Sequence, residues 1–153
     1  MNSRAKVTER NKKFLKECFG WTEENWLDFM REVGPPLNKY GANPDPTNPT
    51  KGWCGGVTMA LRLSGKVPEG YIACRQKIDP HYYMINPITK EVIDLTIYQM
   101  KEEYEHDYTD YSRRFMNVLS LSVSMLMQKL NLEIDPNKFY IIKKRQNFIK
   151  IKS

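Results

Sequence analysis

Two short runs of strand-forming residues around a turn constrain this chain more than any other feature. Residues 81–86 and 91–96 are rich in Tyr, Ile and Val, and Pro87-Ile88-Thr89-Lys90 between them has the composition of a turn. Residues 71–77 predict a further strand just before this hairpin. The pattern therefore predicts a central antiparallel sheet.

Helical patterns flank this sheet in the sequence. Apolar residues at helical spacing predict helices over 7–19, 22–33, 54–64 and about 111–130, and apolar runs near the C-terminus predict a closing hairpin. We therefore expect a single α+β domain over 1–153. Its parts are the N-terminal helices (1–34), a Pro- and Asn-rich loop (35–53), a core (54–134) and a basic C-terminal hairpin (138–153).

The net charge of +6 is concentrated at the two ends of the chain. Residues 1–16 carry +5 and residues 138–153 carry +6, which leaves −5 on the middle. If the ends met on one face, they would form a patch for nucleic acid or an acidic protein partner. Alternatively, both ends are ordinary solvated faces. The candidate patch residues near the C-terminus are Lys143, Lys144, Arg145, Lys150 and Lys152.

The cysteine count and the first residues point to a reducing compartment. Cys18, Cys54 and Cys74 cannot all pair, and the N-terminal residues lead into a polar helix instead of an apolar signal core. The uncharged stretch 115–128 is too short and too polar to cross a bilayer. We expect free thiols, no membrane partner and a cytoplasmic protein, in the host cytoplasm if the Lys-, Asn-, Tyr- and Met-rich chain is phage-encoded.

One cysteine and one histidine stand where thiol chemistry would need them. Cys54 opens the helix expected over 54–64, after Trp53 and before Gly55 and Gly56, and His81 opens a strand 27 residues later. Unpaired backbone N–H groups and the positive end of the helix dipole lower the pKa of a thiol. The glycines would let a substrate carbonyl approach backbone donors. A strand-borne imidazole would then serve as base and later as acid.

Sheet geometry selects the residue that would orient this histidine. If the turn centres on Ile88 and Thr89, the numbers of paired residues sum to 177, so that His81 and Asp94 share a face with Tyr83 and Thr96. Asn86 points to the other face, although a slip of one residue would reverse the choice. We therefore expect a Cys54/His81/Asp94 triad, with Asn86 as the alternative orienting residue.

The remaining cysteines and histidine have ordinary interpretations. Cys18 lies on the apolar stripe of a helix and Cys74 lies within a strand, so both are expected in the core. His106 stands in an acidic stretch and is expected to be solvated. No group of His, Cys, Asp or Glu has the spacing of metal ligands, and the glycines near Cys54 lack the ending of a phosphate loop. The sequence therefore predicts neither a metal nor a cofactor.

The arrangement resembles the papain-like and transglutaminase-like cysteine hydrolases, in which a helix bearing Cys precedes a sheet bearing His and then Asp or Asn. Within that superfamily, residues 50–130 are similar to the small YunG-like proteins of bacteria and phages. The resemblance lies in Cys54 to Leu63, in His81-Tyr82-Tyr83 and in Ile93-Asp94-Leu95-Thr96-Ile97-Tyr98-Gln99. It implies a papain-like core in which helices pack on a central antiparallel sheet.

The chain departs from both families at the oxyanion donor. The YunG-like proteins tend to have Gln before the Cys, where this chain has Trp53. Papain-like enzymes have Gln six residues upstream, where this chain has Asn48. Asn48 or Asn43 would supply an amide N–H, or backbone donors such as that of Gly55 would serve alone. Trp53 and Tyr83 are candidate walls of the substrate cleft.

Two classes of function follow from these observations. The first is a cysteine-dependent acyl-transfer enzyme that acts on an amide, ester or thioester and transfers the acyl group to water or an amine. The second is a non-catalytic binding protein whose basic ends contact nucleic acid or an acidic protein. The substrate itself is not encoded in any of these motifs.

Overall fold

The computed structural model describes residues 3–37, 45, 47–77, 80–106, 111–112, 118–138, 140–142 and 149–152. The helices are α1 (Arg4–Phe19), α2 (Glu23–Val33), α3 (Cys54–Leu63), α4 (Leu121–Lys129) and the 3-10 helix η2 (Ile97–Gln99). The strands are β1 (Ile72–Gln76), β2 (Tyr82–Ile85), β3 (Val92–Ile93), β4 (Tyr111–Ser112), β5 (Val118–Leu119), β6 (Tyr140–Ile142) and β7 (Ile149–Lys152). The chain is thus α+β, as its sequence predicts.

The central sheet has the strand order β3-β2-β1-β4, and each neighbouring pair is antiparallel. In the β2–β3 hairpin Met84 pairs with Ile93 and Ile85 pairs with Val92, so the predicted register is confirmed. The two strands are shorter than predicted, and Asp94 follows directly after β3. Both His81 and Asp94 therefore lie at the open end of the hairpin, away from its turn.

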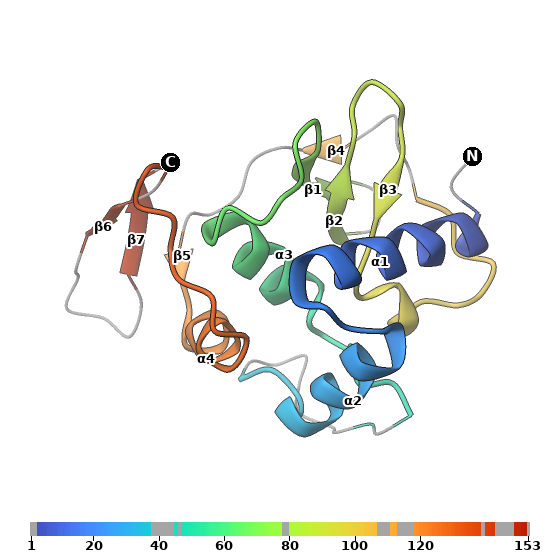
Figure 1. Cartoon of the computed structure of the whole chain (residues 1–153), viewed down its shortest axis with the longest axis horizontal. Coiled ribbons are helices and arrows are strands. Elements are labelled where there is room, and N and C mark those ends of the chain that lie inside the picture. Colours follow the sequence, from blue (N-terminus) through green and yellow to red (C-terminus); the bar gives the residue numbers. More distant parts are fainter. Residues whose placement is uncertain are drawn as a thin grey trace.

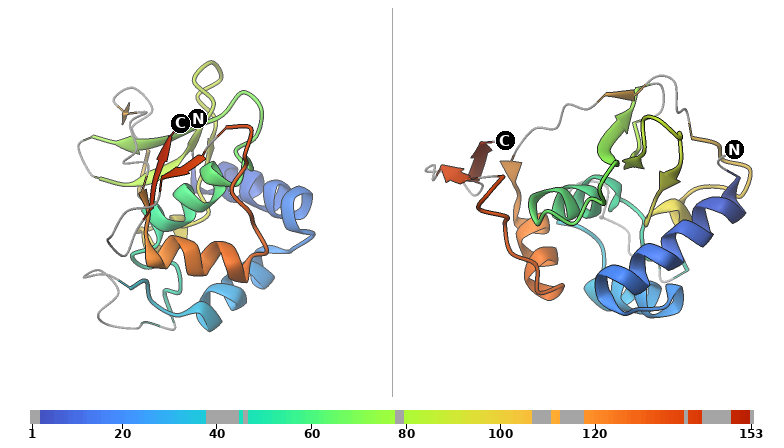
Figure 2. Two further views of the ribbon diagram at one scale, coloured as in Figure 1. Left: turned by 90° about the vertical axis from the view of Figure 1, so that its left-hand side faces the viewer. Right: turned by 45° about the horizontal axis from the view of Figure 1, so that its top comes forward.

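Helices α2, α3 and α4 lie together below the central sheet in Figure 1, and α1 runs beside the edge strand β3 (Figures 1 and 2). Helix α3 packs on β2 and on α4, and α1 packs on β3 and on α2. Their shared core contains Trp26, Trp53 and Leu126, which are fully buried. Helix α3 is thereby fixed between the sheet and α4, with its first residue, Cys54, beside β2.

The local sequence signals set the ends of the N-terminal helices as expected. The Ser3 side chain caps α1, and Gly20 ends it with a left-handed backbone at φ 71°. Thr22 and Asn25 form a capping box at the start of α2. The loop that follows is described only in part, because residues 38–44 and 46 lie outside the described residues.

The long helix predicted over 111–130 is wrong in its first half. Strands β4 and β5 occupy two stretches of it, and α4 begins only at Leu121, where the Ser120 hydroxyl accepts the N–H of Val123 at 3.2 Å. The apolar residues before Ser120 belong partly to strand pairing, since β5 pairs with β7. Helical periodicity within one segment gives no information about a strand that pairs with it from about thirty residues further along the chain.

The closing hairpin is confirmed, and it has an additional neighbour. Strands β6 and β7 pair antiparallel, and β5 extends them into a separate sheet of order β5-β7-β6. Lys150 and Lys152 lie on β7, whereas Lys143, Lys144 and Arg145 lie outside the described residues. This sheet and the start of α1 are at opposite ends of the molecule in Figure 1. The described basic residues of β7 and those at the start of α1 are therefore not side by side, and the patch predicted at residues 143–145 lies outside the described part of the chain.

The two glycines after Cys54 differ in their packing. A Cβ at Gly56 would lie 2.8 Å from the buried Trp53 ring, whereas a Cβ at Gly55 would lie 3.5 Å from the Tyr82 ring, an ordinary contact. We expect Gly56→Ala to lower the free energy of unfolding by about 1–3 kcal/mol through overpacking. Gly55→Ala, its matched control, should cost nothing or gain up to about 1 kcal/mol from helix propensity.

Denaturant unfolding of the two variants checks this prediction. Equal stability of Gly55→Ala and Gly56→Ala would show that the contact with Trp53 does not limit the packing of α3.

Candidate functional site

Cys54 is the first residue of α3 and is half-buried. The preceding residue, Trp53, supplies no side-chain cap, so the N–H groups of the first turn are not capped from that position. These N–H groups and the helix dipole place partial positive charge around the thiol. The residue thus has both access to solvent and an electropositive surrounding.

The pKa of the Cys54 thiol is lowered from its ordinary value. Burial acts in the opposite direction, but a hydrogen bond and the charge of His81 outweigh it, and the backbone N–H of Tyr82 also donates to the sulfur. At the other two thiols burial prevails: it raises the pKa of Cys18 despite the charge of Lys66, and it raises that of Cys74 to about 12 despite a hydrogen bond with Tyr83. Cys54 is therefore the only one of the three cysteines whose surroundings favour a thiolate.

His81 is bound to Asp94 on the side of its ring away from Cys54. Its Nε2 lies 2.6 Å from Asp94 Oδ2, and the two side chains are 3% and 1% exposed. Burial disfavours the charged imidazole, but the Asp94 charge and the Cys54 partner outweigh it and raise the pKa of His81 to about 10. The same pairing keeps the pKa of Asp94 well below its usual range despite complete burial. The three side chains thus stand in the order thiol, imidazole, carboxylate, and each pKa shift favours the charged form of its group.

The N-terminal helices hold the backbone of Asp94 in place. The Asn11 amide on α1 donates to the Asp94 carbonyl at 2.7 Å and accepts the Asp94 N–H at 2.9 Å. The Trp26 indole on α2 donates to the Leu95 carbonyl at 2.8 Å. The sequence pattern of these helices gives no direct sign of this role. Only the burial of Asn11 on an otherwise apolar helix face would have signalled its role.

Asn86, the alternative orienting residue, is a turn residue instead. Its Oδ1 accepts the N–H groups of Ile88 and Thr89 at 3.0 and 3.1 Å, which closes the β2–β3 turn. The predicted face assignment, with Asp94 and His81 together, agrees with the structure.

His106 is a part of this cluster that the sequence did not reveal. The expectation of a solvated residue is wrong: its side chain is fully buried, and its Nε2 lies 2.8 Å from the same Asp94 Oδ2. Glu103 and Glu105, which precede it, are exposed, so His106 points into the protein although the acids before it point to solvent. Composition averages over such a segment and therefore misses the buried residue.

His81, Asp94 and His106 together are also a set of metal-ligand types, with their ligand atoms within 4.8 Å of one another. The Nε2–Oδ2 distances of 2.6 and 2.8 Å are hydrogen-bond lengths. Ligand atoms around a tetrahedral zinc lie about 3.3 Å apart, given metal–ligand bonds of about 2.0–2.1 Å. The geometry fits two imidazoles that donate to a carboxylate better than it fits a metal centre.

The predicted cleft and oxyanion residues lie in different surroundings in the structure. Trp53 is not a cleft wall: it is fully buried, and its indole N–H donates to the Gly34 carbonyl at 2.8 Å. Tyr83 is buried beside His81, with ring centroids 5.8 Å apart. Gly55 is half-buried against Tyr82. Asn48 is half-buried in a turn, and its Oδ1 has no hydrogen-bond partner among the described residues. Asn43 lies outside the described residues.

Gln99 is a second amide near the start of α3. Its Oε1 accepts the N–H of Gly52 at 3.0 Å, two residues before Cys54. Its Nε2 is buried and has no hydrogen-bond partner in the described part of the chain. The Gln99 amide thus connects η2 to the residues just before Cys54.

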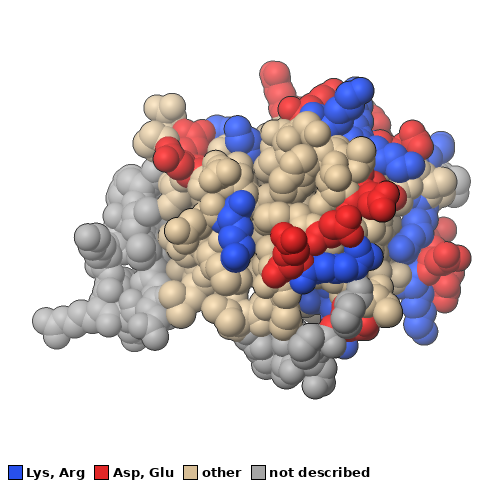
Figure 3. Space-filling view, turned by 60° about the horizontal axis from the view of Figure 1, so that its bottom comes forward, with Lys and Arg blue, Asp and Glu red and all other residues tan. Residues whose placement is uncertain are grey.

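The basic residues of α1 are partly used in packing. Arg10 pairs with Glu91 at 3.1 Å and donates to the Val92 carbonyl, and Arg4 donates to the Met100 and Lys101 carbonyls. On the face shown in Figure 3, basic and acidic side chains lie beside one another, not in a patch of one sign. These contacts connect α1 to the segment that carries Asp94.

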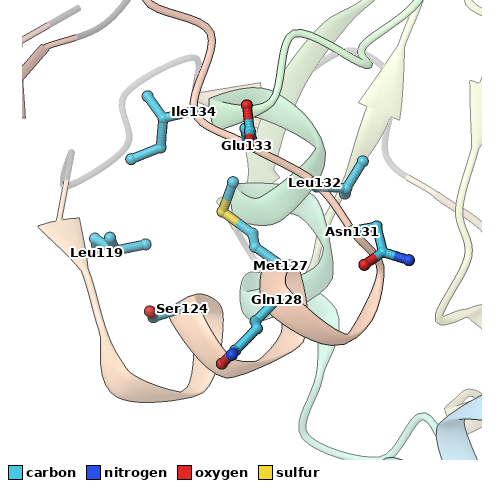
Figure 4. A pocket seen from close by; sticks show the side chains of 8 residues that line it. All are labelled: Leu119, Ser124, Met127, Gln128, Asn131, Leu132, Glu133 and Ile134. Carbon is cyan, nitrogen blue, oxygen red and sulfur yellow. The ribbon is translucent and has the colours of Figure 1, made fainter.

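A separate cavity of about 440 Å³ lies between α4 and the chain that follows it (Figure 4). Met127 and Leu132 line it together with Leu119 and Ile134, and Ser124, Gln128, Asn131 and Glu133 complete the wall. None of Cys54, His81, Asp94 and His106 is among these residues, so the cavity is not part of the thiol site.

Within the described residues, no helix has both the length and the apolar character needed to span a membrane. Comparison of the chain with protein-family models, with curated proteins and with solved structures found no match.

Proposed function

We propose that this protein is a cysteine-dependent acyl-transfer enzyme that acts on an amide, ester or thioester through Cys54, His81 and Asp94. The observation that carries the proposal is the row of three groups: a partly exposed thiol with a lowered pKa, an imidazole bound to it, and a buried carboxylate on the far side of the imidazole. Nucleophile, base and orienting group stand in the order that covalent catalysis requires.

In the first half-reaction the Cys54 thiolate attacks the carbonyl carbon and forms a tetrahedral intermediate. Because Asp94 occupies Nε2 of His81, Nδ1 is the ring nitrogen that faces the sulfur. Its proton passes to the leaving amine, alcohol or thiol as the bond to the carbonyl carbon breaks. The product of this step is a thioester on Cys54.

In the second half-reaction neutral His81 takes a proton from water or an amine, which attacks the thioester. The acyl group leaves as an acid or amide, and Cys54 regains its thiolate with protonated His81 beside it. Asp94 keeps its charge throughout and stabilises the imidazolium. The oxyanion in both steps is assigned to N–H groups of the first turn of α3, with the Gln99 amide near them; Asn48 remains a candidate donor.

The likeness to papain-like cores belongs to this proposal as well. A Cys-bearing helix that precedes a His- and Asp-bearing antiparallel sheet supports it, as does the packing of α3 against β2. A cytoplasmic location would keep all three thiols reduced. Partners through the basic termini are not needed for this chemistry.

Trapping the acyl-enzyme tests the proposal. We expect intact mass spectrometry to show one acyl group added on incubation with activated esters or thioesters, and peptide mapping to place it on Cys54. Cys54→Ala should remove the adduct, whereas Cys18→Ala should retain it. Acylation shared equally among the three cysteines, or none across a panel of acyl groups, would refute the proposal.

A further inference from the structure

His106 makes a directed contact that the proposed triad does not use. It follows η2 in the chain, and its Nε2 lies 2.8 Å from Asp94 Oδ2 with the side chain fully buried. Tyr83 and Tyr104 meet its ring edge-to-face, with centroids 4.7 and 5.1 Å away. The ring is thus held on two sides by aromatic contacts and directed at the carboxylate.

The Asp94 carboxylate has a full set of donors. Oδ1 accepts the N–H of Thr96 at 3.0 Å and its hydroxyl at 3.2 Å. Oδ2 accepts from His81 at 2.6 Å and from His106 at 2.8 Å. A carboxylate offers about four lone-pair sites, so each donor competes with the others for its electron density. Removal of one donor makes the carboxylate more basic toward those that remain.

The contacts also fix which nitrogen of His106 bears the proton. A carboxylate only accepts hydrogen bonds, so the proton lies on Nε2. His106 Nδ1 is buried and has no hydrogen-bond partner among the described residues. A buried N–H without an acceptor is rarer than a buried acceptor without a donor, so Nδ1 is expected to hold a lone pair. His106 therefore serves Asp94 and is not a second base toward Cys54.

We propose that His106 is a positioning residue, which orients the Asp94 carboxylate toward His81 and lowers the basicity of that carboxylate. The inference rests on the proposed function for its catalytic meaning. Because the His106 imidazole also donates to Oδ2, Asp94 holds the His81 proton less tightly. That proton is then easier to transfer. The titratable groups that face His106 in the described residues are Asp94, His81, Tyr83 and Tyr104.

Histidine-selective ¹⁵N NMR tests the inference directly, because the chain has only two histidines and both belong to this cluster. We expect His106 in the wild-type protein to show a low-field, slowly exchanging Nε2 proton and an unprotonated Nδ1. A proton on Nδ1 alone, or a His106 ring that exchanges freely with water, would overturn the inference without any variant.

Two substitutions separate positioning from packing. His106→Phe keeps a ring but removes the donor, and His106→Gln places an amide N–H near the position of Nε2. We expect the Phe variant to raise the His81 titration midpoint by about one to two units, the shift produced by a lost hydrogen bond to a charged group. The Gln variant should restore it. A merely structural His106 would leave the His81 midpoint unchanged in both.

These measurements need no substrate, so they can fail independently of the proposed function. A chain that forms no acyl-enzyme but shows the predicted His106 tautomer and midpoint shift would refute only the proposed function. A chain that forms the acyl-enzyme on Cys54 while His106→Phe leaves the His81 midpoint unmoved would refute only the role of His106. If neither variant folds, the wild-type tautomer decides.

Discussion

Asp94→Ala should lower the free energy of unfolding by about 3–5 kcal/mol, because it leaves two buried imidazoles and Thr96 without their acceptor. Asp28→Ala is the matched control. Asp28 pairs with Arg31 at 2.6 Å, the same separation as in the His81–Asp94 pair, but its side chain is 61% exposed. An exposed pair contributes about 0–1 kcal/mol, so the two variants should differ several-fold in their effect.

The pH dependence of this loss follows from the two pKa shifts. The lowered pKa of Asp94 gives stability that is complete above its ordinary pKa of 3.8 and is lost as pH falls. The raised pKa of His81 gives stability that is complete below its ordinary 6.5 and is lost as pH rises through about 10. The difference between wild type and Asp94→Ala should therefore be largest from pH 3.8 to 6.5 in denaturant unfolding. Equal effects of Asp28→Ala and Asp94→Ala would contradict this account.

His81→Ala should make alkylation of Cys54 at neutral pH at least about tenfold slower. Without the imidazole, burial and the Asp94 charge, which both raise the pKa of this thiol, are opposed by the Tyr82 N–H and the N-terminal end of α3 alone. A rise of one pKa unit reduces the thiolate fraction about tenfold below the pKa.

Cys18 and Cys74 serve as internal standards for that variant. Their alkylation rates should stay unchanged, since His81 does not influence the pKa of either thiol. Faster alkylation of the buried Cys74 would report unfolding, and His81→Gln would then replace His81→Ala. An unchanged alkylation rate at Cys54 in a folded variant would show that the His81 imidazole does not activate this thiol.

Much of the site geometry could be predicted because it depends on local signals. The turn at Pro87–Lys90 fixes the hairpin register, and a register places His81 and Asp94 on one face without knowledge of the rest of the fold. The start of α3 at Cys54 follows from a short apolar helix that Gly65 and Pro68 terminate. Neither inference needs contacts between distant parts of the chain.

The parts that escaped prediction depend on distant contacts. Asn11 reaches Asp94 across 83 residues, and its role shows only when α1 lies on β3. His106 follows the exposed acids Glu103 and Glu105, so its burial comes from the docking of one loop onto the sheet. Likewise, Trp53 is a core residue whose buried indole N–H donates to the carbonyl of Gly34 on a distant part of the chain. A single sequence encodes these contacts but does not display them as a pattern.

The pH dependence of Cys54 alkylation in the wild-type protein, followed by peptide mapping of all three cysteines, tests the central claim most directly. The account predicts that Cys54 reacts fastest, with an apparent pKa clearly below the ordinary thiol value of about 8.5. Cys18 and Cys74 should titrate above that value. A Cys54 that titrates at or above about 8.5 would contradict the claim that Cys54 and His81 form a reactive pair.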